Sequence, residues 1–287
     1  MGFPKIYIEI TNVCNLRCSF CRGTVRKREF MDPEVFRAYA TEAKQFTDYV
    51  YLHVMGEPFL HPQLDRIIDI ASEIGLRVCL TTNGTLFHKK MEILRPRVSA
   101  LYKISISLHA HEGNGEDAMG APLEDYVRGV AESARELGKS GVISVLRLWN
   151  ADNPDAVSPA KNTQNGRTLA ILREIFDGEW TVNRRGQRIG EGVYLEWGEK
   201  FDWPTDDGTL PDRGPRAHCF AMKDHVAILV DGRVLPCCID CDGRMALGDL
   251  HEKSLAAILA DAPAEEFRRQ LAEGRLVHPL CRHCNFK

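Results

Sequence analysis

Hydrophobic and polar positions along the first two thirds of the chain form blocks of two alternating kinds. One kind is short and rich in β-branched residues, which favours strands, and the other carries apolar residues at helical spacing. The predicted strands cover residues 6–10, 49–55, 76–82, 101–109, 142–149 and 193–197. The predicted helices cover residues 33–46, 61–74, a segment around Ile93, 123–137 and 168–176. Strands that alternate with helices predict a parallel sheet of six β/α units, curled into a partial barrel.

Local signals mark the ends of these helices and two loops between them. Asp32 is the predicted N-cap of the first helix, and Gly75 and Gly138 are predicted to end two others. The glycine-rich segment 109–122 and the polar segment 150–166 are predicted loops. Both follow strands, whose carboxyl ends carry the chemistry in barrel-like folds, so both are candidate substrate-facing segments. A solvated surface loop is the alternative for most of their residues.

The composition changes after the last predicted strand. A stretch rich in Pro, Asp and Gly predicts a linker, and beyond it Asp231-Gly232 between two apolar runs predicts a β-hairpin. Two further helices are predicted over residues 253–260 and 263–273. We therefore expect a barrel domain over residues 1–197, a linker over 198–215, and a small cysteine-bearing domain over 216–287.

The bulk composition is that of an ordinary globular protein, with 287 residues, 44% hydrophobic and 27% charged, and a formal net charge of −3. Such a charge gives no general attraction to phosphate backbones, so nucleic acid is not expected as a partner. The N-terminus does not resemble a signal peptide, and no apolar run is long enough to cross a membrane. We therefore expect a cytoplasmic protein without a membrane partner.

Ten cysteines are many for a cytoplasmic chain, where thiols stay reduced, and their short spacings argue for metal ligands rather than disulfides. Cys14, Cys18 and Cys21 follow directly on the first predicted strand. Three thiolates suit three corners of a [4Fe-4S] cluster and leave the fourth iron open for chemistry. The alternative is a zinc site, although zinc usually takes four N or S ligands.

The spacing Cys-x3-Cys-x2-Cys after an opening strand, with Phe20 just before the third cysteine, resembles the signature of the radical S-adenosylmethionine (SAM) superfamily. Met55-Gly56-Glu57-Pro58 resembles the Gly-Gly-Glu-Pro segment whose backbone binds the SAM amino group, with Met55 in place of the first glycine. Asn83 and Ser107 lie in segments that resemble the further wall of the SAM site. The resemblance places Phe20 beside the adenine, with simple loop packing as the alternative.

A second group of cysteines, with Gly232 placed before Cys237, resembles the shortened SPASM module called Twitch, which holds one auxiliary [4Fe-4S] cluster. Its members are Cys219, Cys237, Cys281 and Cys284. A four-cysteine zinc site uses the same ligands and is the alternative. Cys238 and Cys241 are expected to be non-ligands, and Cys79 a small buried apolar residue. The resemblance implies a partial (β/α)6 TIM-like barrel followed by a small cysteine-rich domain of β-hairpin and helix.

The resemblance also implies the chemistry: SAM is reductively cleaved at the first cluster, and a hydrogen atom is removed from the substrate. A reducing partner such as flavodoxin or ferredoxin is then expected. Arg147 lies in an apolar strand and is expected to face the cavity and bind a carboxylate of SAM or substrate, with an ion pair to Glu196 as the alternative. His109 and His111 are candidate acids or bases, with ordinary loop histidines as the alternative.

We expect oxidation or modification of a small molecule or peptide, helped by the auxiliary cluster. One alternative is a radical SAM enzyme that matures a ribosomal peptide or a protein. A second is RNA modification, which depends only on the local basic run Arg26, Lys27 and Arg28. The alternative of a different class is a non-catalytic iron-sulfur or zinc-binding electron-transfer module.

Overall fold

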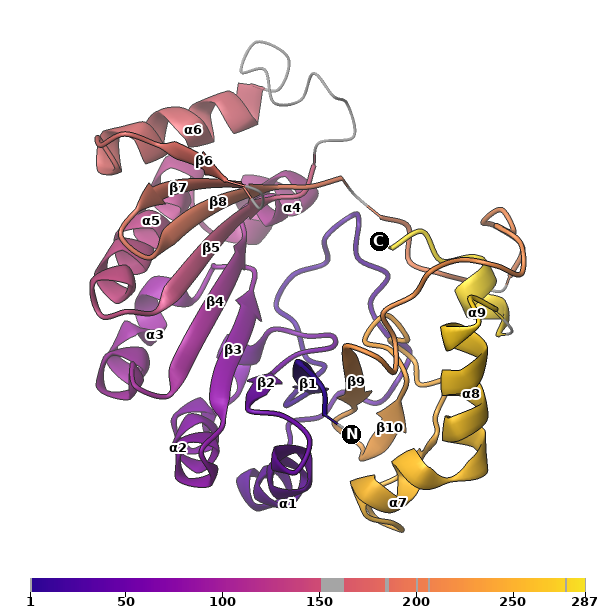
Figure 1. Ribbon diagram of the computed structural model, residues 1–287. Coiled ribbons are helices and arrows are strands. Elements are labelled where there is room, and N and C mark those ends of the chain that lie inside the picture. The colour runs from indigo at the N-terminus through magenta and orange to yellow at the C-terminus, as the bar shows by residue number, and fades with distance from the viewer. Residues whose placement is uncertain are drawn as a thin grey trace.

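The computed structural model describes residues 2–150, 163–183, 186–199, 201–205, 207–276 and 278–286. Within them a parallel sheet forms the centre of the fold, and Figure 1 shows it curving around an open interior. Its neighbouring strands, in sheet order, are β1 (Lys5–Ile8), β2 (Tyr49–Tyr51), β3 (Arg77–Thr82), β4 (Leu101–Ser107), β5 (Ile143–Leu148) and β8 (Val193–Trp197). These strands confirm the predicted partial barrel of six parallel strands.

The sheet continues beyond both of its predicted edges. On one side β9 (His225–Ile228) pairs in parallel with β1, and the predicted hairpin follows with β10 (Arg233–Leu235) and the short β11 (Gly248–Asp249). On the other side β7 (Gly186–Gly190) and β6 (Thr181–Asn183) form an antiparallel extension that the sequence did not predict. The C-terminal cysteines are therefore joined to the barrel through its own sheet.

Helices cover the outer face of the sheet (Figure 1). They are α1 (Pro33–Lys44), α2 (Leu64–Ile74), α3 (Phe87–Leu94), α5 (Leu123–Lys139) and α6 (Thr163–Ile175), with the 3-10 turns η1 (Pro58–Leu60) and η2 (Arg95–Arg97). The C-terminal part carries α7 (Leu255–Ala260), α8 (Ala262–Ala272) and α9 (Pro279–Arg282). In α1, Asp32 is the N-cap as predicted, and Phe36, Ala40 and Ala43 form the buried stripe expected of an amphipathic helix.

Strand alternation separates the core from the interior of the barrel. In β4, Ile104 and Ile106 are fully buried in the apolar core, whereas Lys103 and Ser107 line the interior cavity. Cys79 in β3 is fully buried, as predicted. The interior is consequently polar and aromatic, although the strands themselves are mostly apolar.

Three predictions about local structure were wrong. The predicted loop 109–122 contains a kinked helix, α4 (Ala110–Met119), with Gly115 at a positive φ of 75°. Gly138 does not end α5 but lies inside it, and it is a glycine there because a Cβ would stand 2.0 Å from the carbonyl oxygen of Glu191. Of the predicted loop 150–166, residues 151–162 lie outside the described part of the chain, and the rest begins α6.

Candidate active site

The first cysteine group lies on the loop after β1, at the carboxyl end of the barrel strands. Cys14 and Cys18 are half-buried and Cys21 is exposed, and none forms a disulfide. Burial is the main cause that raises the pKa of the Cys14 thiol to about 11, and Glu57 and the nearby thiols of Cys18 and Cys21 contribute to this rise. Three cysteines on one loop, two of them partly withdrawn from water, suit an iron-sulfur cluster, whose binding would displace the thiol protons.

Helix α4 holds this loop in place. The Ser19 N–H donates to the carbonyl oxygen of Gly113 over 3.0 Å, and the Asn114 side-chain amide donates to the Cys18 sulfur over 3.0 Å. Gly113 must be a glycine, because a Cβ there would lie 2.6 Å from the ring of Phe20. That ring packs against His109 with centroids 4.8 Å apart. The helix missed by the sequence analysis therefore shapes the cysteine loop.

A buried carboxylate fastens the same loop to three other segments. Glu9 forms a two-bond ion pair with Arg26, at 2.6 and 2.8 Å, and accepts backbone N–H bonds from Met55 at 3.0 Å and Val230 at 3.1 Å. The side chains are 0% and 6% exposed for Glu9 and Arg26. Arg26 is therefore a structural residue. It does not belong to a surface run of basic residues that could contact RNA.

The segment that resembles a SAM-binding loop is tied to the cysteines by backbone contacts. The Glu57 N–H donates to the Val13 carbonyl over 2.8 Å, and Gly56, at a φ of 78°, packs so closely on Thr11 that a Cβ would clash. The Glu57 carboxylate is buried and accepts from the N–H groups of Phe59 and Asn83 at 3.1 and 2.7 Å. Burial raises its pKa to about 7, although these hydrogen bonds oppose the shift.

Asn83, which was predicted to form the further wall of the SAM site, lies next to the cysteine loop. Its side-chain amide donates to Asn15 over 3.0 Å and lies 3.9 Å from the Cys14 sulfur. The Tyr126 hydroxyl donates to the Asn83 carbonyl oxygen over 2.7 Å. Asn83 is thereby fixed between the third strand and the cysteine loop.

One cavity of about 380 Å³ brings these predicted residues together. Among the residues that line it are all the predicted SAM-site residues except Pro58: Cys14, Cys18, Phe20, Cys21, Gly56, Glu57, Asn83, Ser107 and Arg147. The side chain of Arg147 also pairs with Glu196 at 3.0 Å and lies over the Trp149 ring at 4.5 Å. Arg147 therefore lines the cavity and also forms the ion pair of the alternative, while its binding of a SAM or substrate carboxylate stays a prediction.

The cavity has further walls that the sequence analysis did not predict. They comprise Lys5, Tyr7, Tyr51, His53, Lys103, Phe201, Trp203, Cys238 and Phe286. Phe201 contacts Trp203 and Phe286, with ring centroids 5.2 and 4.9 Å apart. The sequence did contain a sign that Lys5 and Lys103 face the cavity, since each is a charged residue in an apolar strand, as Arg147 is.

The second cysteine group gathers around the β9–β10 hairpin and α9. Burial is the main cause that raises the pKa of Cys284 to about 11, and Cys237 and Cys219 contribute to this rise. The pKa of Cys281 rises for the same reason, with Cys237, Cys219 and Cys284 all contributing. These mutual effects place the four predicted ligands near one another.

Cys237 also belongs to a second possible ligand set. Its sulfur, the Cys238 sulfur and a ring nitrogen of His225 lie within 4.8 Å of one another. Cys238 additionally lines the large cavity. The ligand chemistry of either set suits iron or zinc.

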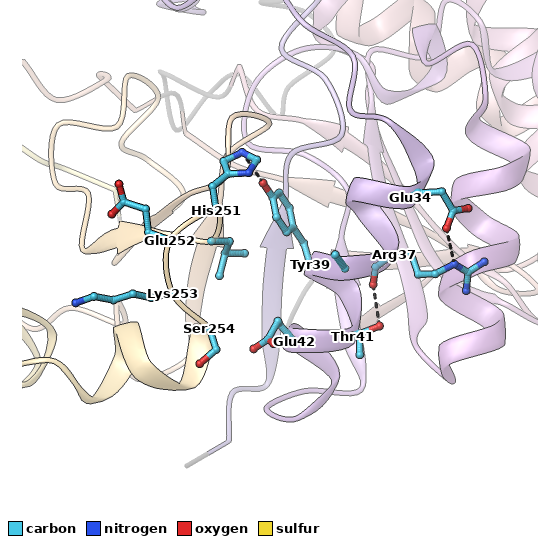
Figure 2. A pocket seen from close by; sticks show the side chains of 11 residues that line it. Glu34, Arg37, Tyr39, Thr41, Glu42, His251, Glu252, Lys253 and Ser254 are labelled. Atoms are coloured by element: carbon cyan, nitrogen blue, oxygen red, sulfur yellow. Dashed lines mark hydrogen bonds and ion pairs between the residues drawn. The ribbon is translucent and has the colours of Figure 1, made fainter.

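A further surface hollow lies between α1 and residues 250–254, away from the cysteines. Figure 2 shows Tyr39 directed at His251, and the two side chains form a hydrogen bond of 3.0 Å. Glu42 accepts from the Leu255 N–H over 3.1 Å. These contacts dock the C-terminal part on the barrel and provide no cysteine for chemistry.

A partial barrel with three clustered thiols at its mouth and a second thiol group beside it defines the class of cysteine-ligated iron-sulfur enzymes. The chain belongs to the radical SAM superfamily, whose family model matches residues 8–155. Residues 219–285 match SPASM, an iron-sulfur cluster-binding domain. The protein therefore carries [4Fe-4S] clusters and uses SAM, which argues against the zinc alternative.

Individual relatives are similar over the whole chain. The chain is 23% identical to the S-adenosyl-L-methionine-dependent 2-deoxy-scyllo-inosamine dehydrogenase of Niallia circulans, over 99% of this chain and 93% of that protein. The structure of BtrN in complex with AdoMet and 2-DOIA matches with a TM-score of 0.63 and 20% identity, over 100% of this chain and 95% of that one. Streptococcus suis SuiB bound to precursor peptide SuiA matches with a TM-score of 0.56 and 14% identity, over 99% and 71%.

The structural matches establish the shared fold. According to their titles, one of the matched structures holds the small molecule 2-DOIA and another holds a precursor peptide. In the part of the chain that the structure describes, no helix has the length and apolar character needed to cross a membrane.

Proposed function

We propose that this radical SAM enzyme oxidises a small molecule held in the 380 Å³ cavity, with Cys14, Cys18 and Cys21 as ligands of the SAM-cleaving cluster. When bound, that cluster and SAM supply reductive cleavage of the sulfonium and removal of a substrate hydrogen atom. The observation that carries the proposal is the convergence of these cysteines and the predicted SAM-site residues on one cavity. The family establishes an enzyme, contrary to the electron-carrier alternative.

The protein's own residues then have separate tasks. The backbone at Gly56, Glu57 and Pro58 would orient the SAM amino group, and Phe20 would pack against the adenine. Asn83 and Ser107 would form the further wall. Arg147, already held by Glu196, would bind a carboxylate. Trp203 and Phe286 would help to exclude water from the cavity.

Cys219, Cys237, Cys281 and Cys284 would hold the auxiliary cluster, which would accept an electron or hold the substrate. Flavodoxin or ferredoxin would deliver the reducing electron, and the exposed Cys21 lies on the surface that such a partner could approach. Residues 1–197, 198–215 and 216–287 would be barrel, linker and auxiliary domain. Because β9 pairs with β1, we expect the auxiliary domain to depend on the barrel for its stability. The cytoplasmic location stays a prediction.

A small molecule is favoured over a peptide because the cavity volume is within the range of small-molecule sites. The dehydrogenase relative supports oxidation as the reaction type. The fold shared with SuiB keeps peptide maturation as the second candidate.

The test is anaerobic reconstitution, iron and sulfide counting, and reduction with dithionite in the presence of SAM. We expect about eight irons per chain and formation of 5′-deoxyadenosine by the wild type. The triple variant Cys14→Ala/Cys18→Ala/Cys21→Ala should lose about four irons and all nucleoside formation. Persistent SAM cleavage in that variant would show that the reaction does not require these cysteines.

A further inference from the structure

Two lysines in the interior of the barrel form no ion pair with any of the residues that the structure describes. Lys5, in β1, and Lys103, in β4, both line the cavity. Their ammonium nitrogens lie 5.4 and 5.2 Å from the ring centroid of Tyr51, so the two charges approach the same ring from different strands. No carboxylate of the described residues forms an ion pair with either lysine.

The strand register explains why Lys103 points inward. Tyr7 pairs with Tyr51, Tyr51 with Cys79, and Cys79 with Lys103, which places these residues in one row across four strands. Residues of one row in a parallel sheet share a face. We call Lys5, Tyr51, His53 and Lys103 the cavity floor.

The floor lies deeper than the proposed SAM site. Lys103 precedes Ser107 by four positions in β4, which corresponds to about 13 Å along a strand. Lys5 begins β1, whereas Cys14 follows the end of that strand. The floor is thus separated from the cysteines by roughly the length of a strand.

The positive charges in the cavity lower the pKa values of neighbouring groups. Arg147 is balanced by Glu196 at 3.0 Å, whereas Lys5 and Lys103 remain in excess. Burial, followed by the charge of Arg147, lowers the pKa of Lys103. Burial, followed by the charges of Arg147, Lys103 and Lys5, lowers the pKa of His53 to about 3. His53 therefore stays neutral.

Two other polar atoms of cavity-lining side chains have no hydrogen-bond partner in the part of the chain that the structure describes. The Nδ1 atom of His53 and the indole Nε1–H of Trp149 are buried, and neither has a hydrogen-bond partner among the described residues. Buried polar atoms in native structures normally have partners, so unpaired ones in a cavity point to a ligand. At the cavity floor, an ammonium pair beside a neutral imidazole favours an oxygen-rich anion.

We infer that the cavity floor binds an oxyanion, a carboxylate or a phosphate group, and that the enzyme acts on a small anionic substrate. This inference rests on the proposed function, since it names the substrate class of the same cavity. A positively charged substrate would meet like charge at Lys5 and Lys103. The anionic group would anchor the substrate at the floor and leave its other end toward the SAM site.

The test is calorimetric titration of the reconstituted, SAM-bound enzyme with inorganic phosphate and, separately, with succinate, at constant ionic strength set with chloride. Binding of phosphate but not succinate would identify the bound group as a phosphate, and binding of succinate but not phosphate would identify it as a carboxylate. Either result supports the inference. Lys103→Gln and Lys5→Gln should weaken that binding at least tenfold, and Lys103→Arg should restore most of it. Lys89→Gln, on the exposed surface of α3, is the matched control.

Binding of neither anion to the wild type would overturn the inference, as would equal binding by the glutamine variants. The SAM affinity of the same variants separates the two possible sources of the oxyanion. If SAM binding falls tenfold and anion binding does not, the lysines hold the SAM carboxylate and the inference is wrong. Failure of the wild type to cleave SAM, with anion binding intact, would instead contradict the proposed function. Melting temperatures show which variants remain folded.

Discussion

The side-chain amide of Asn114 donates a hydrogen bond to the sulfur of Cys18 over 3.0 Å, from a helix to a loop nearly one hundred residues earlier in the chain. The side-chain oxygen of Asn114, Oδ1, accepts from the Arg17 N–H over 3.1 Å. A donor to a cluster sulfur stabilises the reduced cluster, because the added electron increases the negative charge on sulfur. Asn114 therefore both positions the cysteine loop and would tune the reduction potential.

We expect Asn114→Ala to make the potential of the SAM-binding cluster more negative. If the lost hydrogen bond contributes about 1 kcal/mol, the shift is about 40 mV for a one-electron couple. A redox titration followed by electron paramagnetic resonance measures it. Asp117→Ala, an exposed change on the same helix, is the control. An unchanged or more positive potential in Asn114→Ala would contradict this role.

The contrast between α4 and the cysteine motif shows what the sequence could reveal. The spacing of Cys14, Cys18 and Cys21 is local, so it was recognisable without a structure. Helix α4 contains Gly113, Asn114 and Gly115, which are poor helix formers, and it is held by contacts with the distant cysteine loop. Local propensity therefore predicted a loop, and tertiary contacts decided otherwise.

The buried pair of Glu9 and Arg26 supports a prediction about stability. Arg26→Met leaves the Glu9 carboxylate without its cation and removes a bond of 2.9 Å to the Cys241 carbonyl. Loss of one partner of a buried ion pair typically costs about 3–5 kcal/mol. Denaturant unfolding measures the loss.

The matched control is Lys27→Met, because Lys27 is 83% exposed and pairs with Glu29 at the surface. We expect a much smaller loss of stability there, because water screens an exposed ion pair. Equal stabilities of the two variants would show that Arg26 is not structural. The burial of Arg26 was not predictable from the basic run, since its partners Glu9 and Cys241 are far along the chain.

Glu57 provides a prediction about pH. Burial raises its pKa from 4.5 to about 7 in the folded state. The folded protein therefore keeps the proton at pH values where the unfolded chain has lost it, and stability falls as the pH rises from 4.5 toward 7. Between about pH 6 and pH 8 this carboxyl should remove about 1 kcal/mol of the unfolding free energy.

Glu57→Gln should lack this contribution, so its stability should fall less than that of the wild type over the same interval. The variant should also be less stable at both pH values, because an amide NH2 would replace one of two oxygens that accept from Phe59 and Asn83. Denaturant unfolding at the two pH values gives both quantities. Parallel pH dependence in the two proteins would show that Glu57 is ionised throughout.

The interior of the barrel was less predictable than its mouth. Alternation in β4 shows that Lys103 and Ile104 face opposite sides, but the sequence does not say which side is covered by helices. Only the register across β2, β3 and β4 brings Lys103 to Tyr51. Arg147 was predicted to face the cavity, and the same argument applied to Lys5 and Lys103 would have found the floor.

The ligands of the auxiliary cluster can be decided by iron counting. Cys284 is near Cys219 and Cys237, whereas Cys238 is near Cys237 and His225. If the family spacing holds, Cys284→Ala should fall to about four irons and Cys238→Ala should keep about eight. Both variants should still form 5′-deoxyadenosine with dithionite and SAM, since the first cluster is untouched. The reverse iron counts would assign His225, Cys237 and Cys238 to the cluster. Because Cys238 also lines the cavity, that result would place the auxiliary cluster directly at the substrate.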